Sequence, residues 1–363
     1  MGNVMRIAFV GNSDISIAGY RTELIERLLS LGHEIYLVCP DGELLDPLKE
    51  MGCKLIETKV DRHGTNPIKD LKLIKSYKRI FKELRPDIVL SFTIKPNIYA
   101  SMACGKLKIP IVVNVTGLGS AVENPGWKQK ITVMLYKMAF KRVKTVFFQN
   151  ADNMQFFVDR KIAVEKHKLL PGSGVNLKRF ELCEYPSEGE INFVFVSRIM
   201  KEKGIDQYID AAKYITEKYS NTKFHICGFC EEEYEQQLKE LTECGVITYH
   251  GMVKDMMTVL PAMSCTVHPT FYPEGLSNVL LESCAVGRPI ITTDRAGCRE
   301  VVDAGVNGFI CKQRDSEDLI LQIERFLALT HDERKSMGLE GRKKVEAEFD
   351  REIVIKKYLE ELV

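Results

Sequence analysis

Hydrophobic and polar residues alternate along the first half of the chain in two recurring patterns. Short runs rich in Val, Ile and Phe are typical of buried strands, and longer segments with apolar residues at helical spacing are typical of amphipathic helices. The expected strands cover residues 6–12, 34–40, 54–58, 87–93, 108–117 and 144–150, and the clearest helices cover 20–33 and 68–86. This alternation predicts a mostly parallel sheet with helices on both faces.

A second α/β pattern follows residues 171–190, which are rich in Pro, Gly and charge and therefore mark a domain boundary. The expected strands then cover residues 191–199, 223–229, 246–251, 265–270, 289–294 and 308–312. We expect two α/β domains, residues 1–178 and 179–345, and a last helix at 346–363. Open α/β sheets bind ligands at the carboxyl ends of their strands, so the expected site is a cleft between the domains.

Composition narrows the class of protein. The chain has 51 basic and 50 acidic residues, which argues against nucleic-acid binding by the protein as a whole. No uncharged apolar stretch reaches the roughly 18–20 residues that span a bilayer. No export signal is recognised and the eleven cysteines are scattered, so we expect a cytoplasmic protein with reduced thiols. The single C-x-x-C, Cys227–Cys230, lacks a second ligand pair, which favours strand-end thiols over a metal site.

The strongest candidate site lies in residues 265–294, which predict a strand, a loop, a helix and a return strand. The helix is expected to begin at Ser277 or Asn278, where free N–H groups and the helix dipole can bind an anion. Glu282 lies about one turn inside this helix within an apolar run. There it can accept hydrogen bonds from two ribose hydroxyls; the alternative is a surface residue of an amphipathic helix. Glu274 lies in the loop before this helix, where its carboxylate would contact the part of the ligand that carries the anion.

Arg198 and Lys203 form the second candidate group, at the end of the expected strand 191–199 and the start of the next helix. Two cations at this position suit a diphosphate and would neutralise charge on a phosphate leaving group. Basic residues after a strand are also commonly solvated. Combined with Glu274 and Glu282, the pair becomes a strong signal of a functional site.

Several motifs together resemble the retaining glycosyltransferases of family 4, which have the GT-B fold. They are Arg-x(4)-Lys-Gly, the strand end "CGF", "HG" before a helix, and Glu-Gly-x(6)-Glu-x(4)-Gly-x-Pro. The first half, with "VTGLGSAV" before a basic helix, resembles bacterial enzymes of capsule, exopolysaccharide, O-antigen or lipid-linked glycan assembly. One such group adds N-acetylgalactosamine to a sugar on polyprenyl diphosphate. The resemblance implies two Rossmann-like domains facing across a cleft: an acceptor domain at 1–178 and a donor domain at 179–345. The helix at 346–363 would cross back to the first.

The resemblance also implies roles for individual residues. Arg198 and Lys203 match the pair that holds the donor diphosphate and stabilises its departure, Glu274 the ligand of the sugar hydroxyls, and Glu282 the ligand of the ribose. The other positions that match donor-binding positions are Gly228, Met252, Val253, Gly275, Leu276, Ser277, Asn278 and Val279. Leu276-Ser277 departs from the family's usual aromatic or Pro residue. The resemblance further implies that the sugar keeps its anomeric configuration and that no metal or other cofactor is needed, since the chain has no Asp-x-Asp.

Candidate residues in the first half are weaker. Gly11 and Gly19 stand where the family carries Gly-Gly in a phosphate loop near its first helix. Other candidates are the strand-end loop residues Thr116, Gly117 and Gly119, which would face the acceptor or the diphosphate, and Lys95 and Asn97 after another strand. In the second half, His250 and His268 could line the cleft, although a strand-end histidine with a purely structural role is more common.

Residues 127–148 predict a basic amphipathic helix followed by a strand. The segment carries Trp127, Lys128, Lys130, Lys137, Lys141, Arg142 and Lys144 and has no acidic residue. This pattern favours peripheral contact with an anionic membrane at its cytoplasmic face, and the alternative is a solvated basic face.

The expected function is transfer of a hexose or N-acetylhexosamine from a UDP-linked sugar to a hydroxyl of a polyprenyl-diphosphate-linked saccharide. No nucleic-acid partner is expected. Two other functions stay open: a nucleotide-sugar 2-epimerase of the same fold, and a non-catalytic sugar-nucleotide-binding subunit. The intact set of Arg198, Lys203, Glu274 and Glu282 disfavours the latter.

Overall fold

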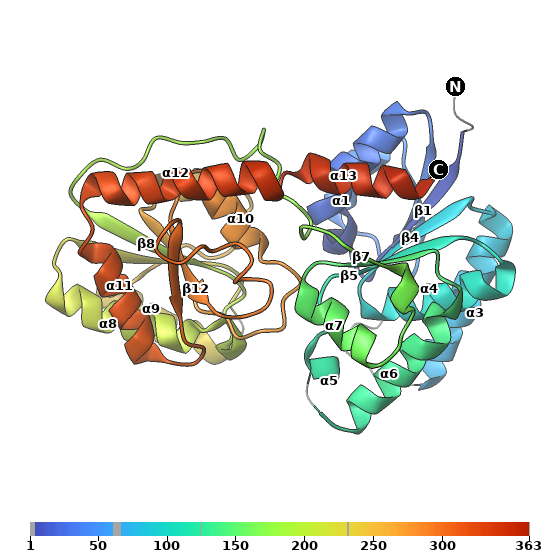
Figure 1. Ribbon diagram of the computed structural model, residues 1–363, viewed down its shortest axis with the longest axis horizontal. Coiled ribbons are helices and arrows are strands. Elements are labelled where there is room, and N and C mark those ends of the chain that lie inside the picture. The colour runs from blue at the N-terminus through green and yellow to red at the C-terminus, as the bar shows by residue number, and fades with distance from the viewer. Residues whose placement is uncertain (1–3, 61–66, 124, 231, 363) are drawn as a thin grey trace. The chain divides into compact units, whose positions relative to one another are not determined.

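The computed structural model describes residues 4–60, 67–123, 125–230 and 232–362 (Figure 1). The chain divides into two compact units. Unit 1 comprises Met1–Ser173 and Val354–Val363, and unit 2 comprises Gly174–Ile353. Each unit is built around its own parallel sheet with helices on both faces, which confirms the predicted α/β fold class.

Unit 1 contains a seven-stranded parallel sheet in the order β3-β2-β1-β4-β5-β6-β7. Its strands are β1 (Arg6–Val10), β2 (Glu34–Cys39), β3 (Lys54–Glu57), β4 (Ile88–Phe92), β5 (Ile111–Val115), β6 (Thr145–Phe148) and β7 (His167–Leu169). Its helices are α1 (Asp14–Ser30), α2 (Asp46–Glu50), α3 (Pro67–Leu84), α4 (Ile94–Leu107), α5 (Ser120–Glu123), α6 (Trp127–Ala139) and α7 (Ala151–Asp159), and most of α13 (Arg351–Leu359) also belongs to it.

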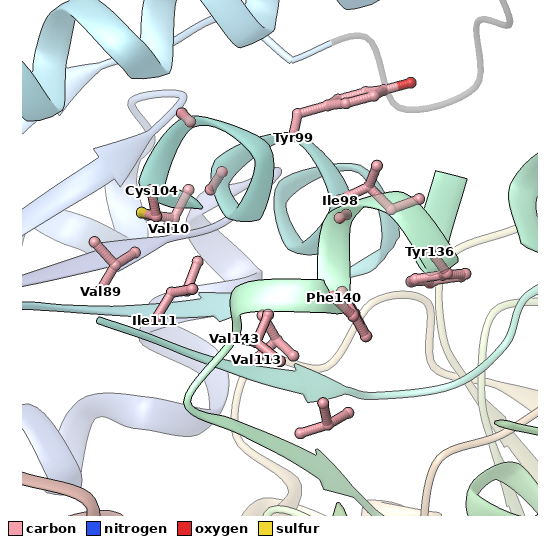
Figure 2. Packing of buried hydrophobic residues seen from close by; sticks show 14 of the residues in the cluster. Val10, Val89, Ile98, Tyr99, Cys104, Ile111, Val113, Tyr136, Phe140 and Val143 are labelled. Carbon is pink, nitrogen blue, oxygen red and sulfur yellow. The ribbon is translucent and has the colours of Figure 1, made fainter. Parts of the chain in front are cut away.

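Both faces of this sheet are covered, which explains why its strands are almost continuously apolar. On one face, side chains from β1, β4 and β5 pack against α3, α4, α6 and α7. Figure 2 shows Val10, Val89, Ile111 and Val113 of the strands in this core, together with Cys104 of α4. On the other face the sheet packs against α1, α2 and α13.

Unit 2 contains a six-stranded parallel sheet in the order β10-β9-β8-β11-β12-β13. Its strands are β8 (Ile191–Val196), β9 (Thr222–Cys227), β10 (Thr248–Tyr249), β11 (Cys265–His268), β12 (Ile290–Thr293) and β13 (Gly308–Cys311). Its helices are α8 (Ile205–Lys218), α9 (Glu232–Glu243), α10 (Asn278–Ala285), α11 (Ser316–Leu327) and α12 (His331–Glu348). The strand order reverses between β8 and β11, so their carboxyl ends are where this type of sheet binds ligands.

The end of the chain is anchored in unit 1. The Tyr358 hydroxyl accepts a hydrogen bond of 2.8 Å from Asn114 Nδ2 on β5. The buried Glu361 carboxylate accepts hydrogen bonds of 2.6 Å each from Thr145 Oγ1 and Lys168 Nζ. The chain therefore passes between the units twice, at residues 173–174 and 353–354.

Helix α1 begins earlier than the residue pattern predicted. It starts at Asp14 rather than near residue 20, because Ser13 and Ser16 form a capping box at its N-terminus. Gly19 consequently lies inside the helix and is exposed, whereas Gly11 lies in the loop after β1. Gly11 and Gly19, which the resemblance placed in one phosphate loop, therefore lie in a loop and in a helix, respectively.

Candidate active site

Three of the predicted residues meet in unit 2 around Tyr272. Lys203 ends the turn before α8, is only 9% exposed, and its Nζ donates to the Glu274 carboxylate in a largely buried ion pair. Lys203 Nζ lies 4.8 Å from the Tyr272 ring centroid, and the guanidinium carbon of the exposed Arg198 lies 5.6 Å from it. Both distances are within the range of cation–π attraction. Tyr272 thus lies near both cations, of which Lys203 is paired with Glu274.

The backbone places these side chains by close contacts between strand ends. The Gly228 backbone has φ +147°, and a Cβ atom there would lie 1.7 Å from the Ser197 carbonyl oxygen. Gly228 N donates to Gly251 O at 2.8 Å, and Ser197 N donates to Cys227 O at 3.0 Å. Only glycine permits this approach, which brings the end of β8, just before Arg198, against the ends of β9 and β10.

Helix α10 begins at Asn278, one of the two starts expected from the sequence. Its N-cap, Ser277, makes no side-chain capping bond, and Ser277 N donates to Gly297 O at 2.8 Å, which fixes the preceding loop. The first-turn N–H groups are therefore not used by a cap and can receive an anion. The side-chain oxygen of Asn278 is buried with no hydrogen-bond partner among the described residues. Gly275 and Leu276 are buried in the loop, and Val279 is half-buried in the first turn.

Glu282 lies in the second turn of α10 and is half-buried. Burial raises the pKa of its carboxyl to about 7, and the nearby Arg351 and Arg179 reduce this shift while Asp255 increases it. A carboxyl that titrates near neutrality at a candidate binding site is a functional candidate. The sequence did not predict these three neighbours of Glu282, because they are distant along the chain. Arg351 lies about 70 residues after Glu282, and Arg179 and Asp255 lie about 100 and 27 residues before it.

The remaining candidates of unit 2 lie nearby in the fold. Met252 is 70% exposed and Val253 half-buried in the segment after β10, whose backbone contacts Gly228. His250 Nε2 lies 3.0 Å from His225 Nδ1, which gives His250 a structural partner. His268 is 2% exposed, and burial together with Lys203 lowers its pKa to about 3, so its imidazole stays neutral.

The predicted residues of unit 1 gather at the carboxyl edge of its sheet. Gly11 follows β1, Thr116, Gly117 and Gly119 follow β5, and Lys95 lies in the first turn of α4 after β4. Lys95 Nζ forms a 3.0 Å ion pair with Asp70 of α3. Asn97 is buried and donates 2.7 Å to Asn114 O, so it has a structural bond.

The basic segment forms α6 and the turn that follows it. Four apolar side chains at helical spacing are exposed, namely Trp127 (64%), Ile131 (45%), Met134 (53%) and Met138 (55%). We call this set the α6 stripe. The exposed lysines Lys128, Lys130, Lys137 and Lys141 flank it. Arg142 Nη1 donates to Gly105 O at 2.8 Å and Lys144 Nζ to Glu361 O at 2.5 Å, so these two cations are tied to the domain.

Within residues 4–60, 67–123, 125–230 and 232–362, no helix is both long and apolar enough to cross a membrane. The same residues contain no group of three or more His, Cys, Asp or Glu side chains arranged to hold a metal ion.

Comparison with known proteins identifies both halves of the chain. Residues 6–150 match the model of glycosyl transferase 4-like domains, and residues 184–344 match that of glycosyl transferases group 1. The chain is 26% identical to the N,N'-diacetylbacillosaminyl-diphospho-undecaprenol alpha-1,3-N-acetylgalactosaminyltransferase of Campylobacter jejuni, over 98% of this chain and 97% of that enzyme. It is 28% identical to the capsular polysaccharide biosynthesis glycosyltransferase CapM of Staphylococcus aureus, over 91% and 90% of the two chains.

Solved structures agree with this assignment at the level of the fold. Anabaena HepE, crystallised with UDP and glucose, matches with a TM-score of 0.79 at 16% identity over 99% of both chains. A glycosyltransferase of Rickettsia africae matches with a TM-score of 0.81 at 19% identity over 99% of this chain and 98% of that one. The chain therefore belongs to the family-4-like glycosyltransferases and has their GT-B fold.

Proposed function

We propose that this chain is a retaining, metal-independent glycosyltransferase. It would move a hexose or N-acetylhexosamine from a UDP-linked sugar to a hydroxyl of a polyprenyl-diphosphate-linked saccharide. The observation that carries the donor part is the Lys203–Glu274 pair, with Lys203 and Arg198 both near the Tyr272 ring, in the same unit as the uncapped start of α10 and Glu282.

The pair orients a sugar diphosphate because it places opposite charges next to each other. A phosphate bound here lies beside the Lys203 ammonium and Arg198, while sugar hydroxyls donate to the Glu274 carboxylate. The first-turn N–H groups of α10 bind phosphate oxygens. Glu282, when ionised, accepts hydrogen bonds from the two ribose hydroxyls.

In the reaction the bond between the anomeric carbon and the diphosphate oxygen breaks, and the bond to the acceptor oxygen forms on the same face of the sugar. The leaving phosphate oxygen takes the acceptor's proton. Arg198 and Lys203 stabilise the charge that develops on the diphosphate. Two cations and a helix start supply the charge that a divalent metal supplies in other glycosyltransferases, and full activity in EDTA is expected. Loss of activity that Mg²⁺ or Mn²⁺ restores would contradict metal independence.

The acceptor part rests on the relatives and on α6. The Campylobacter jejuni relative is named for a diphospho-undecaprenol substrate. The α6 stripe with its flanking lysines is suited to lie at an anionic lipid surface, apolar side chains in the acyl boundary and ammonium groups at the phosphates. We propose peripheral contact with the cytoplasmic face of the membrane through this helix.

Liposome sedimentation tests the membrane contact. The variant Lys137→Glu with Lys141→Glu, and separately Trp127→Ser with Met134→Ser, should lose most binding to vesicles that contain anionic lipid. The control variant Lys213→Glu with Lys239→Glu makes the same charge change at exposed positions of unit 2 and should bind normally. Equal binding of all four proteins would refute the proposed surface.

Donor hydrolysis separates the proposed function from its alternatives. A transferase releases UDP slowly from a UDP-sugar without acceptor, and faster with a lipid-linked saccharide. A 2-epimerase would convert the sugar nucleotide, and a binding subunit would do neither. A panel of nucleotide sugars ranked by thermal shift identifies the donor. If none of the sugars that stabilise the protein is hydrolysed or transferred, the proposal that the chain is an enzyme is refuted.

A further inference from the structure

Tyr272 supplies an aromatic ring to the candidate active site. Its ring centroid lies 4.8 Å from Lys203 Nζ and 5.6 Å from the guanidinium carbon of Arg198. Both cations are therefore within reach of the negative charge on the face of one ring. The proposed function uses the two cations but leaves the ring without a role.

The backbone fixes the Tyr272 loop to the turn that carries Lys203. Phe271 N donates to Glu202 O at 2.9 Å, and Thr270 Oγ1 donates to the same oxygen at 3.3 Å. Thr270 Oγ1 also accepts a hydrogen bond of 3.1 Å from Tyr272 N. These bonds join residues that are next to Lys203 and Tyr272 in the sequence, so the main chain itself keeps the ring close to the ammonium group.

Arg198 depends on this ring more than Lys203 does. The Lys203 ammonium also pairs with the Glu274 carboxylate in a largely buried contact. The Arg198 side chain is exposed, and within the part of the chain that the structure describes it makes a cation–π contact with Tyr272 but no hydrogen bond or ion pair. A long side chain that moves freely loses conformational entropy when it binds a ligand, and a partner that already restrains it reduces that loss.

An aromatic ring suits this task better than a carboxylate would. A carboxylate partner accepts the N–H groups of a guanidinium and offsets its charge, whereas a ring attracts the cation through its face. The N–H donors of Arg198 thus stay available for phosphate oxygens. Its positive charge also stays available where negative charge develops during the reaction.

We propose that Tyr272 is a positioning residue whose ring holds Arg198 and Lys203 in place for the donor diphosphate. The proposal deepens the proposed function and rests on it for the chemistry of the leaving group. Its own content is that the face of the ring, rather than the hydroxyl or the bulk of the side chain, positions the two cations. Binding of UDP therefore depends on the ring whether or not a sugar is transferred.

Substitutions that separate ring, hydroxyl and bulk test the proposal. Tyr272→Leu keeps an apolar side chain without a ring, and it should lower kcat and weaken UDP binding in calorimetry by about tenfold because two cation–π contacts are lost. Tyr272→Phe keeps the ring and should recover both values to within about threefold of wild type. The control Tyr214→Leu removes an exposed ring of α8 whose centroid lies 5.5 Å from Lys218 Nζ, and it should change neither value.

Fluorinated phenylalanines in place of Tyr272 give a readout that a purely structural role would not change. Fluorine withdraws electrons from the ring and weakens its attraction for cations, with little change in shape. As fluorine atoms are added to the ring, kcat and UDP affinity should fall progressively while Tm stays that of Tyr272→Phe. In the Arg198→Gln background the same series should have a smaller effect, because one of the two cations is absent.

Three results would overturn the proposal. They are equal kcat and UDP affinity across the fluorinated series, a loss in Tyr272→Phe as large as that in Tyr272→Leu, and an undiminished effect of fluorine in the Arg198→Gln background. A different result would refute the proposed function instead. If wild type neither transfers a sugar nor releases UDP from any donor, while UDP affinity still follows the fluorinated series, the chain is not the proposed transferase and the role of the ring stands.

Discussion

If Glu282 binds the donor ribose as proposed, its pKa should make donor binding dependent on pH. With a pKa of about 7, the carboxyl is about one-tenth ionised at pH 6 and about nine-tenths ionised at pH 8. In the proposed contact, the ribose hydroxyls would donate hydrogen bonds to the ionised form. Affinity for the nucleotide sugar should therefore fall about tenfold from pH 8 to pH 6, or about 1.4 kcal/mol, and binding at pH 7 should release about half a proton per site.

Calorimetry in two buffers with different protonation enthalpies measures both effects. A nucleotide sugar is the better probe than UDP, because both of its phosphates are esterified and do not titrate in this range. Glu282→Gln keeps the shape of the side chain and should bind weakly at every pH without the slope. Asp255→Asn removes a nearby negative charge and should shift the midpoint to lower pH, while Asn still caps the turn that Asp255 begins.

The same pKa predicts a stability effect of known sign. The folded state binds the proton of Glu282 more tightly than the unfolded state, so without ligand the wild type loses stability as pH rises from about 4.5 to 7. Above pH 7, Glu282→Gln should be more stable than wild type by up to about 3 kcal/mol.

Two results of the binding experiment would refute the reasoning. One is equal affinity of wild type for the nucleotide sugar at pH 6 and pH 8, and the other is the same dependence of affinity on pH in Glu282→Gln.

Three other substitutions test the structure of unit 2. Lys203→Gln should lower kcat about 100-fold or more in steady-state assays, because it would remove the proposed charge stabilisation of the leaving group and leaves Glu274 without its ion pair; a loss under threefold would contradict the proposed role. Gly228→Ala should lower Tm strongly, since its Cβ would lie 1.7 Å from a backbone oxygen; an unchanged Tm would contradict the geometry. Arg288→Met should cost roughly 3 kcal/mol or more in urea unfolding, because the fully buried guanidinium bonds backbone carbonyls of three segments; a cost below about 1 kcal/mol would show that these bonds add little.

Much of the fold follows from local periodicity. Parallel strands buried on both faces are necessarily apolar runs, and the helices between them carry one apolar stripe, so their order could be read from residues alone. The predicted start of α1 was wrong, because the capping box of Ser13 and Ser16 begins the helix at Asp14 despite the weak apolar pattern of the first turn. The site motifs were also local: Glu274 and Glu282 are eight residues apart on one loop and helix, and Arg198 and Lys203 both follow the end of one strand.

The tertiary structure decided what surrounds those motifs. The pairing of Lys203 with Glu274, the Tyr272 ring beside both cations, and the raised pKa of Glu282 depend on burial and on charges from distant segments. Likewise, a run of lysines in the sequence does not distinguish a cation that bonds to the domain, such as Lys144, from exposed cations that flank the α6 stripe, such as Lys137. Residue order determines which groups can act, whereas electrostatic interaction depends on distance and on exclusion of water, and these are set only when the chain is packed.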